Sequence, residues 1–140
     1  MNLIRALEDD MRRKAGISLD WYDVMVHLSE SPGGLCRMSD LAGSLVLSRS
    51  WVTRRIDAME RAGLVHRCPS PDYGRVGHVA LTPSGKRLFG RASVAHVRAV
   101  ERSFTGVLEP AELEQLASAY TRIGRAALAA VADASAATET

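Results

Sequence analysis

Cysteine is scarce in this chain of 140 residues, and uninterrupted apolar runs of membrane-spanning length are absent. The two cysteines, Cys36 and Cys68, lack the spacing of a disulfide framework or a zinc knuckle, which favours reduced thiols in a cytosol. The N-terminal segment carries Arg5, Glu8 and Asp9 where a secretory signal requires an apolar stretch. We therefore expect a cytoplasmic protein that makes no membrane contact.

Patterns that indicate catalysis are also absent from the sequence. It has no Gly-rich phosphate loop, no Ser/His/Asp arrangement and no carboxylate pair at a useful helical spacing. One weak indication of a metal site is that His66, Cys68 and His78 could approach one another, but three ligands without a fourth make a poor structural zinc site. We therefore expect neither an enzyme nor a cofactor nor a metal.

Length and charge indicate one domain with a polyanionic partner. The chain is long enough for a single domain with a core and too short for two ordinary ones. Its net charge is only +2, yet residues 37–91 hold ten basic and four acidic side chains, so the rest of the chain is net acidic. A basic centre favours a polyanion because each neutralised phosphate releases counterions. A solvated charged face without a partner is the alternative explanation.

A capped amphipathic helix is predicted from Ser48 to Gly63. Serine is a good N-cap, glycine favours the left-handed C-terminal position, and apolar Val52, Ile56 and Met59 recur at intervals of four and three residues. The opposite face carries Ser50, Thr53, Arg54 and Asp57, with Arg49 and Arg55 at its margins. Such a face suits contacts with phosphates and base edges.

A shorter helix is predicted to precede this segment. Ser39 is expected to cap it, and apolar Leu41, Ala42 and Leu45 follow at helical spacing. The corner at residues 46–48 leaves room only for a tight turn. Together the two helices are predicted to form a helix-turn-helix.

A basic hairpin is predicted to follow. Residues 64–68 and 76–81 favour strands, and a cluster of proline, serine, aspartate and glycine between them favours a turn, so we expect a two-stranded wing. Arg67 and Arg75 would flank its tip, where a guanidinium can reach phosphates or a narrow minor groove. Thr82, followed by a proline, then begins a new helix.

Long helices are predicted at both ends of the chain. Residues 3–15 and 19–29 form two of them, and residues 83–104 form a third. A further helix begins at Pro110, with apolar residues in alternating three- and four-residue steps typical of nearly parallel packing. Those residues are Leu113, Leu116, Tyr120, Ile123 and Ala127. This apolar surface exceeds what one small domain covers, so a homodimer is expected, with a monomeric bundle as the alternative.

The chain resembles the MarR-type transcriptional regulators over nearly its whole length. The most specific segments are RMSDLAGSLVLSRSWVTRRIDAMERAGLVHR and ALTPSGKR. The resemblance implies a triangular homodimer that binds promoter palindromes and is often controlled by a small phenolic or amphipathic ligand. It assigns the start of the DNA-reading helix to Ser48, Arg49, Ser50, Thr53 and Arg54. It also implies that Arg75 is the wing arginine and that Asp72 supports it, although the family usually has its aspartate closer to the next strand.

An effector pocket would lie where the terminal helices meet the DNA-binding lobe. Trp21, Tyr22 and His27 on the second helix are its candidates, with His96 as a polar partner. The alternative is that the two aromatic residues are ordinary core residues. Redox sensing through Cys68 is a further alternative, since Arg67 and His66 beside it would favour a thiolate.

The sequence therefore predicts a mainly α-helical winged helix-turn-helix with a small β-wing. One domain is expected over residues 1–136, with the DNA-binding lobe at about 35–87, dimerisation helices at about 2–15 and 88–133, and a disordered tail at 134–140. The expected function is a transcriptional regulator, as a repressor, that binds double-stranded DNA as a homodimer. A winged-helix module for protein–protein contact, without specific DNA binding, is the alternative.

Overall fold

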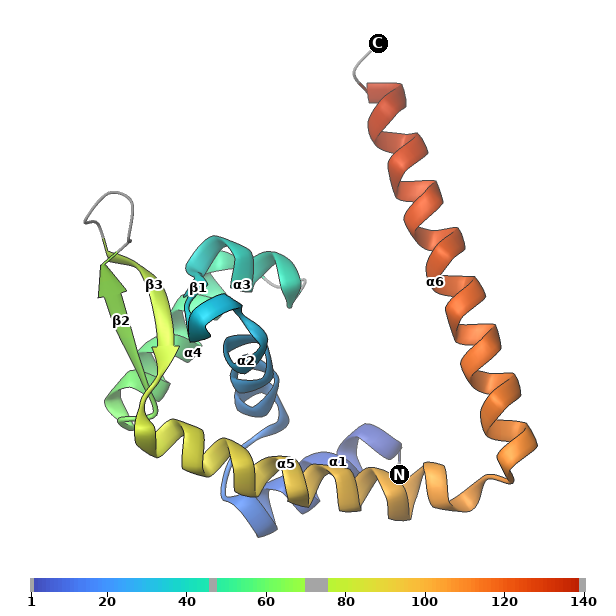
Figure 1. Ribbon diagram of the computed structural model, residues 1–140, viewed down its shortest axis with the longest axis horizontal. Coiled ribbons are helices and arrows are strands. Elements are labelled where there is room, and N and C mark those ends of the chain that lie inside the picture. Colours follow the sequence, from blue (N-terminus) through green and yellow to red (C-terminus); the bar gives the residue numbers. More distant parts are fainter. Residues whose placement is uncertain (1, 46–47, 70–75, 139–140) are drawn as a thin grey trace. The chain divides into compact units, whose positions relative to one another are not determined.

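The computed structural model describes residues 2–45, 48–69 and 76–138 of the chain (Figure 1). Its helices and strands are α1 (Leu3–Ala15), α2 (Leu19–Glu30), η1 (Pro32–Gly34), β1 (Cys36–Arg37), α3 (Met38–Ser44), α4 (Arg49–Arg61), β2 (Val65–Pro69), β3 (Val76–Leu81), α5 (Pro83–Ser103), η2 (Thr105–Val107) and α6 (Pro110–Thr138). The fold is mainly α-helical with a small antiparallel sheet, which confirms the predicted fold class.

Local capping explains where several helices begin and end. The side chain of Ser48 accepts a hydrogen bond from the backbone of Trp51 and so caps α4, as predicted. Thr82 does the same for α5, because its hydroxyl oxygen accepts from the backbone of Gly85 at 3.0 Å. Gly63, with a φ of 70°, turns the chain out of the end of α4. These caps use the residues that the sequence indicated.

The start of α3 differs from the prediction. The helix begins at Met38 and its N-cap is Arg37, whereas the sequence favoured Ser39 as the cap. Arg37 is the last residue of β1 and keeps an extended backbone, so the chain passes directly from strand to helix. Ser39 therefore lies inside the first turn, where its hydroxyl donates to the carboxylate of Asp40 at 3.0 Å.

The sheet has three strands in the order β1-β3-β2, all antiparallel. The register places Val65 opposite Leu81 and Cys36 opposite Val79. The β2–β3 hairpin is the predicted wing, and β1 extends it towards the helices. The side chain of Cys36 is buried.

One hydrophobic core joins α2, α3, α4 and the sheet. The three apolar residues predicted for the inner face of α4, Val52, Ile56 and Met59, are each 0% exposed. They belong to the same cluster as Met25 of α2 and Leu41 of α3. Burying these side chains contributes roughly 1.5–3 kcal/mol each to folding, so the inner face of α4 is firmly held.

The chain divides into two compact units, Met1–Ala99 and Val100–Thr140. The second unit contains η2 and α6, and the helical backbone of α6 continues to Thr138, whereas the sequence suggested a frayed tail from Ala134. Alanine, frequent in this segment, has the highest helix propensity, which favours the continuation. The division into a DNA-binding lobe and dimerisation helices stays a prediction. Among the described residues, no helix has the length and apolarity needed to cross a membrane.

Candidate nucleic-acid interface

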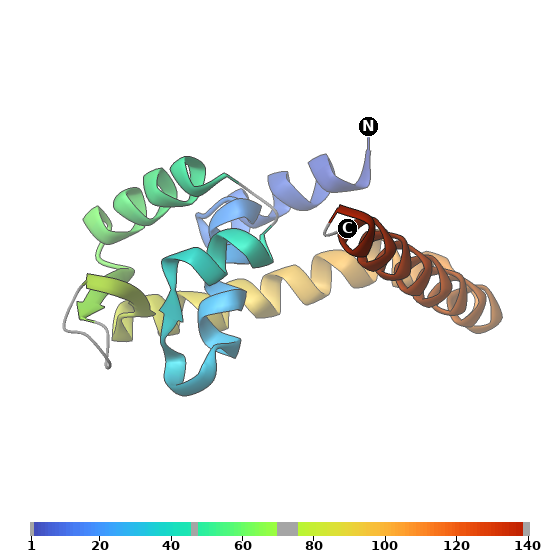
Figure 2. The same cartoon turned by 90° about the horizontal axis from the view of Figure 1, so that it is seen from above.

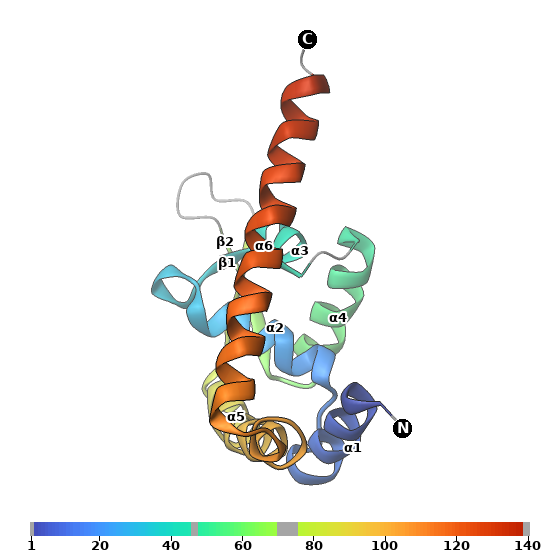
Figure 3. The ribbon, with the colours of Figure 1, turned by 90° about the vertical axis from the view of Figure 1, so that its right-hand side faces the viewer.

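The outer face of α4 is the candidate interface. Figures 2 and 3 show α4 at an outer edge of the first unit. The five helix residues predicted to contact DNA all lie on it and are all exposed: Ser48, Arg49, Ser50, Thr53 and Arg54. A rigid helix with a buried inner face and an uncovered polar face has the form needed to enter a major groove.

The hydroxyl groups on this face are partly engaged within the helix. The side-chain oxygens of Ser48 and Ser50 lie 3.1 Å apart. The hydroxyl of Thr53 donates to the backbone carbonyl of Arg49 at 2.9 Å, which leaves its oxygen lone pairs outward. Thr53 therefore presents an acceptor and a methyl group to a partner.

The guanidinium groups of Arg49 and Arg54 are available for contacts with a nucleic acid. Neither has an ion pair or a side-chain hydrogen bond within the described parts of the chain. Arg49 and Thr53 line a shallow hollow of about 200 Å³ at the start of α3. Two unpaired donors on an exposed helix are suited to phosphates or to the acceptor edge of guanine.

Arg55 differs from these two arginines because it is held. Its Nη2 lies 2.7 Å from a carboxylate oxygen of Asp20 on α2, and its Cζ lies 4.8 Å from the centroid of the Trp51 ring. Arg54, Arg55 and Trp51 nevertheless line the same shallow hollow of about 230 Å³. Arg55 therefore lies beside the interface while its charge is matched by an acidic residue.

The sequence predicted that Arg67 flanks the wing tip with a free guanidinium. In the structure this guanidinium is instead paired with α4. Its guanidinium pairs with both Asp57, at 2.6 Å, and Glu60 of α4, and its backbone N–H donates to Glu60 at 3.0 Å. Partial burial disfavours the charged form, but the hydrogen bonds to the two carboxylates outweigh it and raise the pKa of Arg67. The residue therefore fastens β2 to α4. The sequence predicted that Arg67 lies in a wing strand, but it did not predict the ion pairs with Asp57 and Glu60.

The wing residues Arg75 and Asp72 lie outside the described residues. Their proposed roles in contacting DNA and in supporting the wing stay predictions. The described part of the hairpin ends at Pro69 on one strand and begins again at Val76 on the other.

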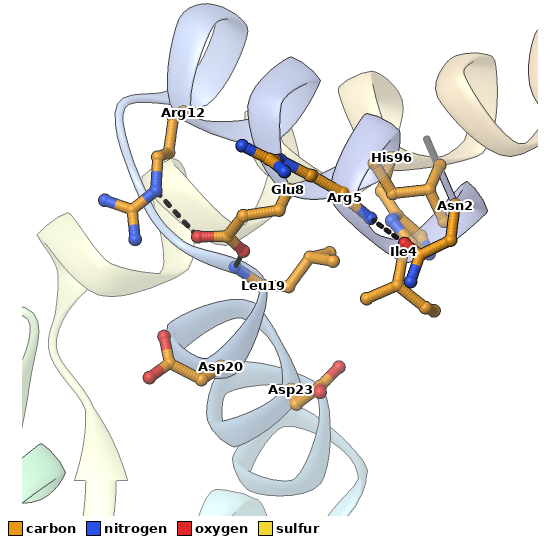
Figure 4. A pocket seen from close by; sticks show the side chains of 10 residues that line it. Asn2, Ile4, Arg5, Glu8, Arg12, Leu19, Asp20, Asp23 and His96 are labelled. Atoms are coloured by element: carbon orange, nitrogen blue, oxygen red, sulfur yellow. Dashed lines mark hydrogen bonds and ion pairs between the residues drawn. The ribbon is translucent and has the colours of Figure 1, made fainter.

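A second feature of the first unit is a hollow of about 720 Å³ between α1 and α2, next to α5 (Figure 4). Figure 4 shows Glu8 and Arg12 on α1 extending towards the start of α2, which carries Asp20 and Asp23. Its other lining residues are Asn2, Ile4, Leu7, Leu19 and His96. The volume lies within the range typical of small-molecule sites.

Three of the five charged residues that line this hollow take part in ion pairs, namely Glu8, Arg12 and Asp20. Glu8 accepts from the Nε of Arg12 at 2.7 Å and from the backbone of Leu19 at 2.7 Å. Asp20 is paired with Arg55 outside the hollow. Desolvation by the surrounding protein raises the pKa of Asp23, although His96 and His27 partly oppose this shift.

Of the four residues predicted for an effector pocket, His96 lines this hollow. Tyr22 instead lies in the core, with its ring stacked on Phe89 at 5.8 Å and tilted against His96 at 4.8 Å. Trp21 is partly buried against the core, and neither it nor His27 lines the hollow. The contribution of α1 was not predicted, because helical spacing does not show which polar residues of one helix will lie near another helix.

The cysteines and histidines of the sheet form no cation site in the described residues, where no group of three ligands is close enough to hold a metal. Cys36 and Cys68 are both free thiols. Cys68 lies opposite His78, whose Nδ1 is buried without a hydrogen-bond partner in the described structure.

Comparison with known proteins assigns the family. Residues 17–76 match the MarR family. The crystal structure of AbsC, a MarR family transcriptional regulator from Streptomyces coelicolor, matches with a TM-score of 0.79 and 34% sequence identity, over 88% of this chain and 82% of that one. This chain belongs to the MarR family. The sequence resemblance is thereby confirmed, and membership of this family of regulators agrees with the expectation that the protein is not an enzyme.

Two further relatives bear on function. The structure of Sco3205, a MarR family transcriptional regulator from Streptomyces coelicolor in complex with DNA, has a TM-score of 0.79 and 27% identity, over 89% of this chain and 78% of that one. The HTH-type transcriptional repressor IacR of Pseudomonas putida is 28% identical over 104 residues, which are 74% of this chain and 60% of that protein. The match thus spans less than two thirds of the length of this curated relative.

Proposed function

We propose that this MarR-type protein is a transcriptional repressor that binds double-stranded DNA in a sequence-specific manner in the cytoplasm. The observation that carries the proposal is the uncovered polar face of α4 above a fully buried inner face. The DNA complex of Sco3205 and the repressor name of IacR support it. In this proposal Ser48, Arg49, Ser50, Thr53 and Arg54 enter the major groove.

The wing completes the proposed interface. Arg75 would reach the minor groove beside the bases contacted by α4, where the potential is most negative, and Asp72 would orient it. The ion pairs of Arg67 with Asp57 and Glu60 support this arrangement because they fix β2 to the groove-reading helix. Movement of one element is then transmitted to the other.

We propose that the active form is a homodimer that binds palindromic promoter sites. The apolar residues predicted on α6 support this, since Leu116, Tyr120 and Ile123 are 40%, 77% and 65% exposed. Exposed apolar residues spaced along one helix mark a surface that a second copy would cover. Light scattering after size exclusion should give twice the chain mass, whereas a monomer at micromolar concentration would contradict the proposal.

We further propose that a small phenolic or amphipathic molecule controls DNA binding from the hollow between α1 and α2. The supporting observations are its volume and its mixture of apolar and charged side chains. Asp20 lines the hollow and is paired with Arg55 of α4, so the hollow is one side chain away from the interface. Trp21, Tyr22 and His27 would then act from the neighbouring core rather than by contact.

Selection of bound sequences from random DNA tests the central proposal. A two-fold symmetric motif with half-sites about 10 base pairs apart is expected. Arg54→Ala should weaken binding to that motif by about 1–3 kcal/mol and relax its sequence preference, while Arg75→Ala should mainly weaken sequence-independent binding. Gel shifts that are unchanged in both variants would contradict the assignment.

The competing function is a winged-helix module for protein–protein contact. DNA binding by the proposed mechanism must weaken steeply with salt, because arginine contacts to phosphates release counterions. The alternative predicts weak association with DNA and no enriched motif. One titration over a salt series therefore separates the two functions.

A further inference from the structure

The three arginines in the first half of α4 do not have equal freedom. Arg49 and Arg54 are exposed and unpaired within the described residues, whereas Arg55 is held between the carboxylate of Asp20 and the ring of Trp51. Arg54 and Arg55 line the same hollow on the surface of α4. The position of Arg55 on α4 would also allow it to contact DNA, as proposed for Arg54.

We propose that Asp20 withholds Arg55 from the phosphate backbone, and that this pairing lowers the affinity of the protein for random DNA relative to its operator. The inference rests on the proposed function and deepens it, because it names a positioning residue that lies outside the interface. Asp20 acts through Arg55 and itself touches no DNA.

Stability alone does not account for the pair. The side chain of Arg55 is 42% exposed and that of Asp20 is 26% exposed, and ion pairs with this degree of solvent contact add little to the free energy of folding. Asp20 also has hydrogen-bond partners other than Arg55. Its second carboxylate oxygen accepts from the Ser18 hydroxyl and from the Trp21 backbone N–H, the latter at 2.9 Å. The pair therefore mainly determines where the guanidinium of Arg55 lies.

Counterion release gives the expected size of the effect. Each phosphate that a protein neutralises adds about 0.9 to the slope of log affinity against log salt concentration. If Asp20→Asn frees Arg55 to reach one phosphate, the slope on random DNA should steepen by about 0.9. Between 50 and 200 mM salt this corresponds to an additional loss of affinity of about 3.5-fold.

Asp20→Asn should also discriminate less well between the operator and random DNA. On an operator, base contacts of α4 fix the docking geometry, so an added cation has limited freedom to find a phosphate. On random DNA the protein settles wherever its cations are best neutralised. The ratio of operator affinity to random-DNA affinity should therefore decrease several-fold in Asp20→Asn at low salt.

The experiment compares five full-length proteins by fluorescence anisotropy on a random duplex and on the selected operator, over a salt series. They are the wild type, Asp20→Asn, Arg55→Gln, the double variant Asp20→Asn/Arg55→Gln, and Glu30→Gln. Glu30 is an exposed acidic residue on the same helix as Asp20, so its variant controls for the loss of one negative charge. A damaged fold lowers affinity, so a gain of binding in Asp20→Asn cannot come from destabilisation.

On the random duplex, the slope of log affinity against log salt concentration should be steeper in Asp20→Asn only. The double variant and Arg55→Gln should have the wild-type slope. A slope in Asp20→Asn equal to that of Glu30→Gln overturns the inference while leaving the proposed function intact. A shallower slope in Arg55→Gln also overturns it, because Arg55 would then already contact phosphates. A wild type that binds neither duplex overturns the proposed function and this inference with it.

Discussion

Replacing Gly85 by alanine should destabilise the protein, whereas the same replacement at Gly90 in the same helix should stabilise it. A Cβ at Gly85 would lie 2.0 Å from the carbonyl oxygen of Leu64 and 3.3 Å from a methyl carbon of Leu81. At Gly90 nothing lies within 4 Å of the added atom. The two substitutions therefore share one helix and one chemical change but meet opposite surroundings.

The magnitude follows from the junction between α4, the wing and α5. An oxygen contact of 2.0 Å must open by about 1 Å, and overpacking of this kind costs about 1–3 kcal/mol. The same carbonyl of Leu64 accepts from the backbone of Thr82 at 3.0 Å, so its displacement also weakens a hydrogen bond contributing about 1 kcal/mol. Alanine recovers about 0.5–1 kcal/mol of helix propensity, which leaves Gly85→Ala less stable by about 2 kcal/mol.

Urea unfolding and thermal melts, both followed by circular dichroism, measure the two variants. Gly85→Ala should lower Tm by roughly 6–10 °C, and Gly90→Ala should raise the free energy of unfolding by about 0.5–1 kcal/mol. Equal stability of the two variants would refute the reasoning, because it would mean that α5 does not approach Leu64 as closely as the structure shows. A lower DNA affinity of Gly85→Ala is also expected, since Leu64 lies directly before the wing strand β2.

Two further substitutions test the charged groups. Arg67→Gln should lower the free energy of chemical unfolding by about 1 kcal/mol, because it leaves Asp57 and Glu60 unpaired. The salt dependence of DNA binding should stay unchanged. A slope of log affinity against log salt concentration that is shallower by about 0.9 would show that this guanidinium contacts phosphate. Asp23→Asn should raise Tm at pH 7, because a raised pKa means that ionising this carboxyl costs stability as the pH rises through the folded value. The gain should vanish below the ordinary aspartate pKa of about 3.9, and thermal melts showing a lower Tm at pH 7 would contradict it.

The parts of the fold that depend on neighbouring residues in sequence were predictable. Ser48 as N-cap, Gly63 as the exit from α4, and the inner face of Val52, Ile56 and Met59 all follow from local spacing and capping chemistry. The exposed face of α4 follows from the same periodicity. The candidate interface was therefore visible in the sequence before its surroundings were known.

The pairing of charges was not predictable, because it depends on contacts between distant segments. Arg55 was placed at the margin of the interface, but its partner Asp20 comes from a different helix. Arg67 was expected to face phosphates, and the turn back from α4 into β2 instead brings it against Asp57 and Glu60. Spacing rules identify which face of an element a residue occupies, and they do not identify what lies opposite that face.

The separation of roles around α4 has a consequence for how operators diverge. The side chains that hold this helix in the core and those that would touch bases are different residues, so Ser50, Thr53 and Arg54 carry almost none of the packing. Descendants of one ancestral regulator can therefore acquire new target promoters by exchanging a few exposed residues, without compensating changes inside the molecule. A combinatorial library randomised at those three positions should yield mostly folded members with altered binding motifs, which makes this scaffold a practical start for designed genetic switches.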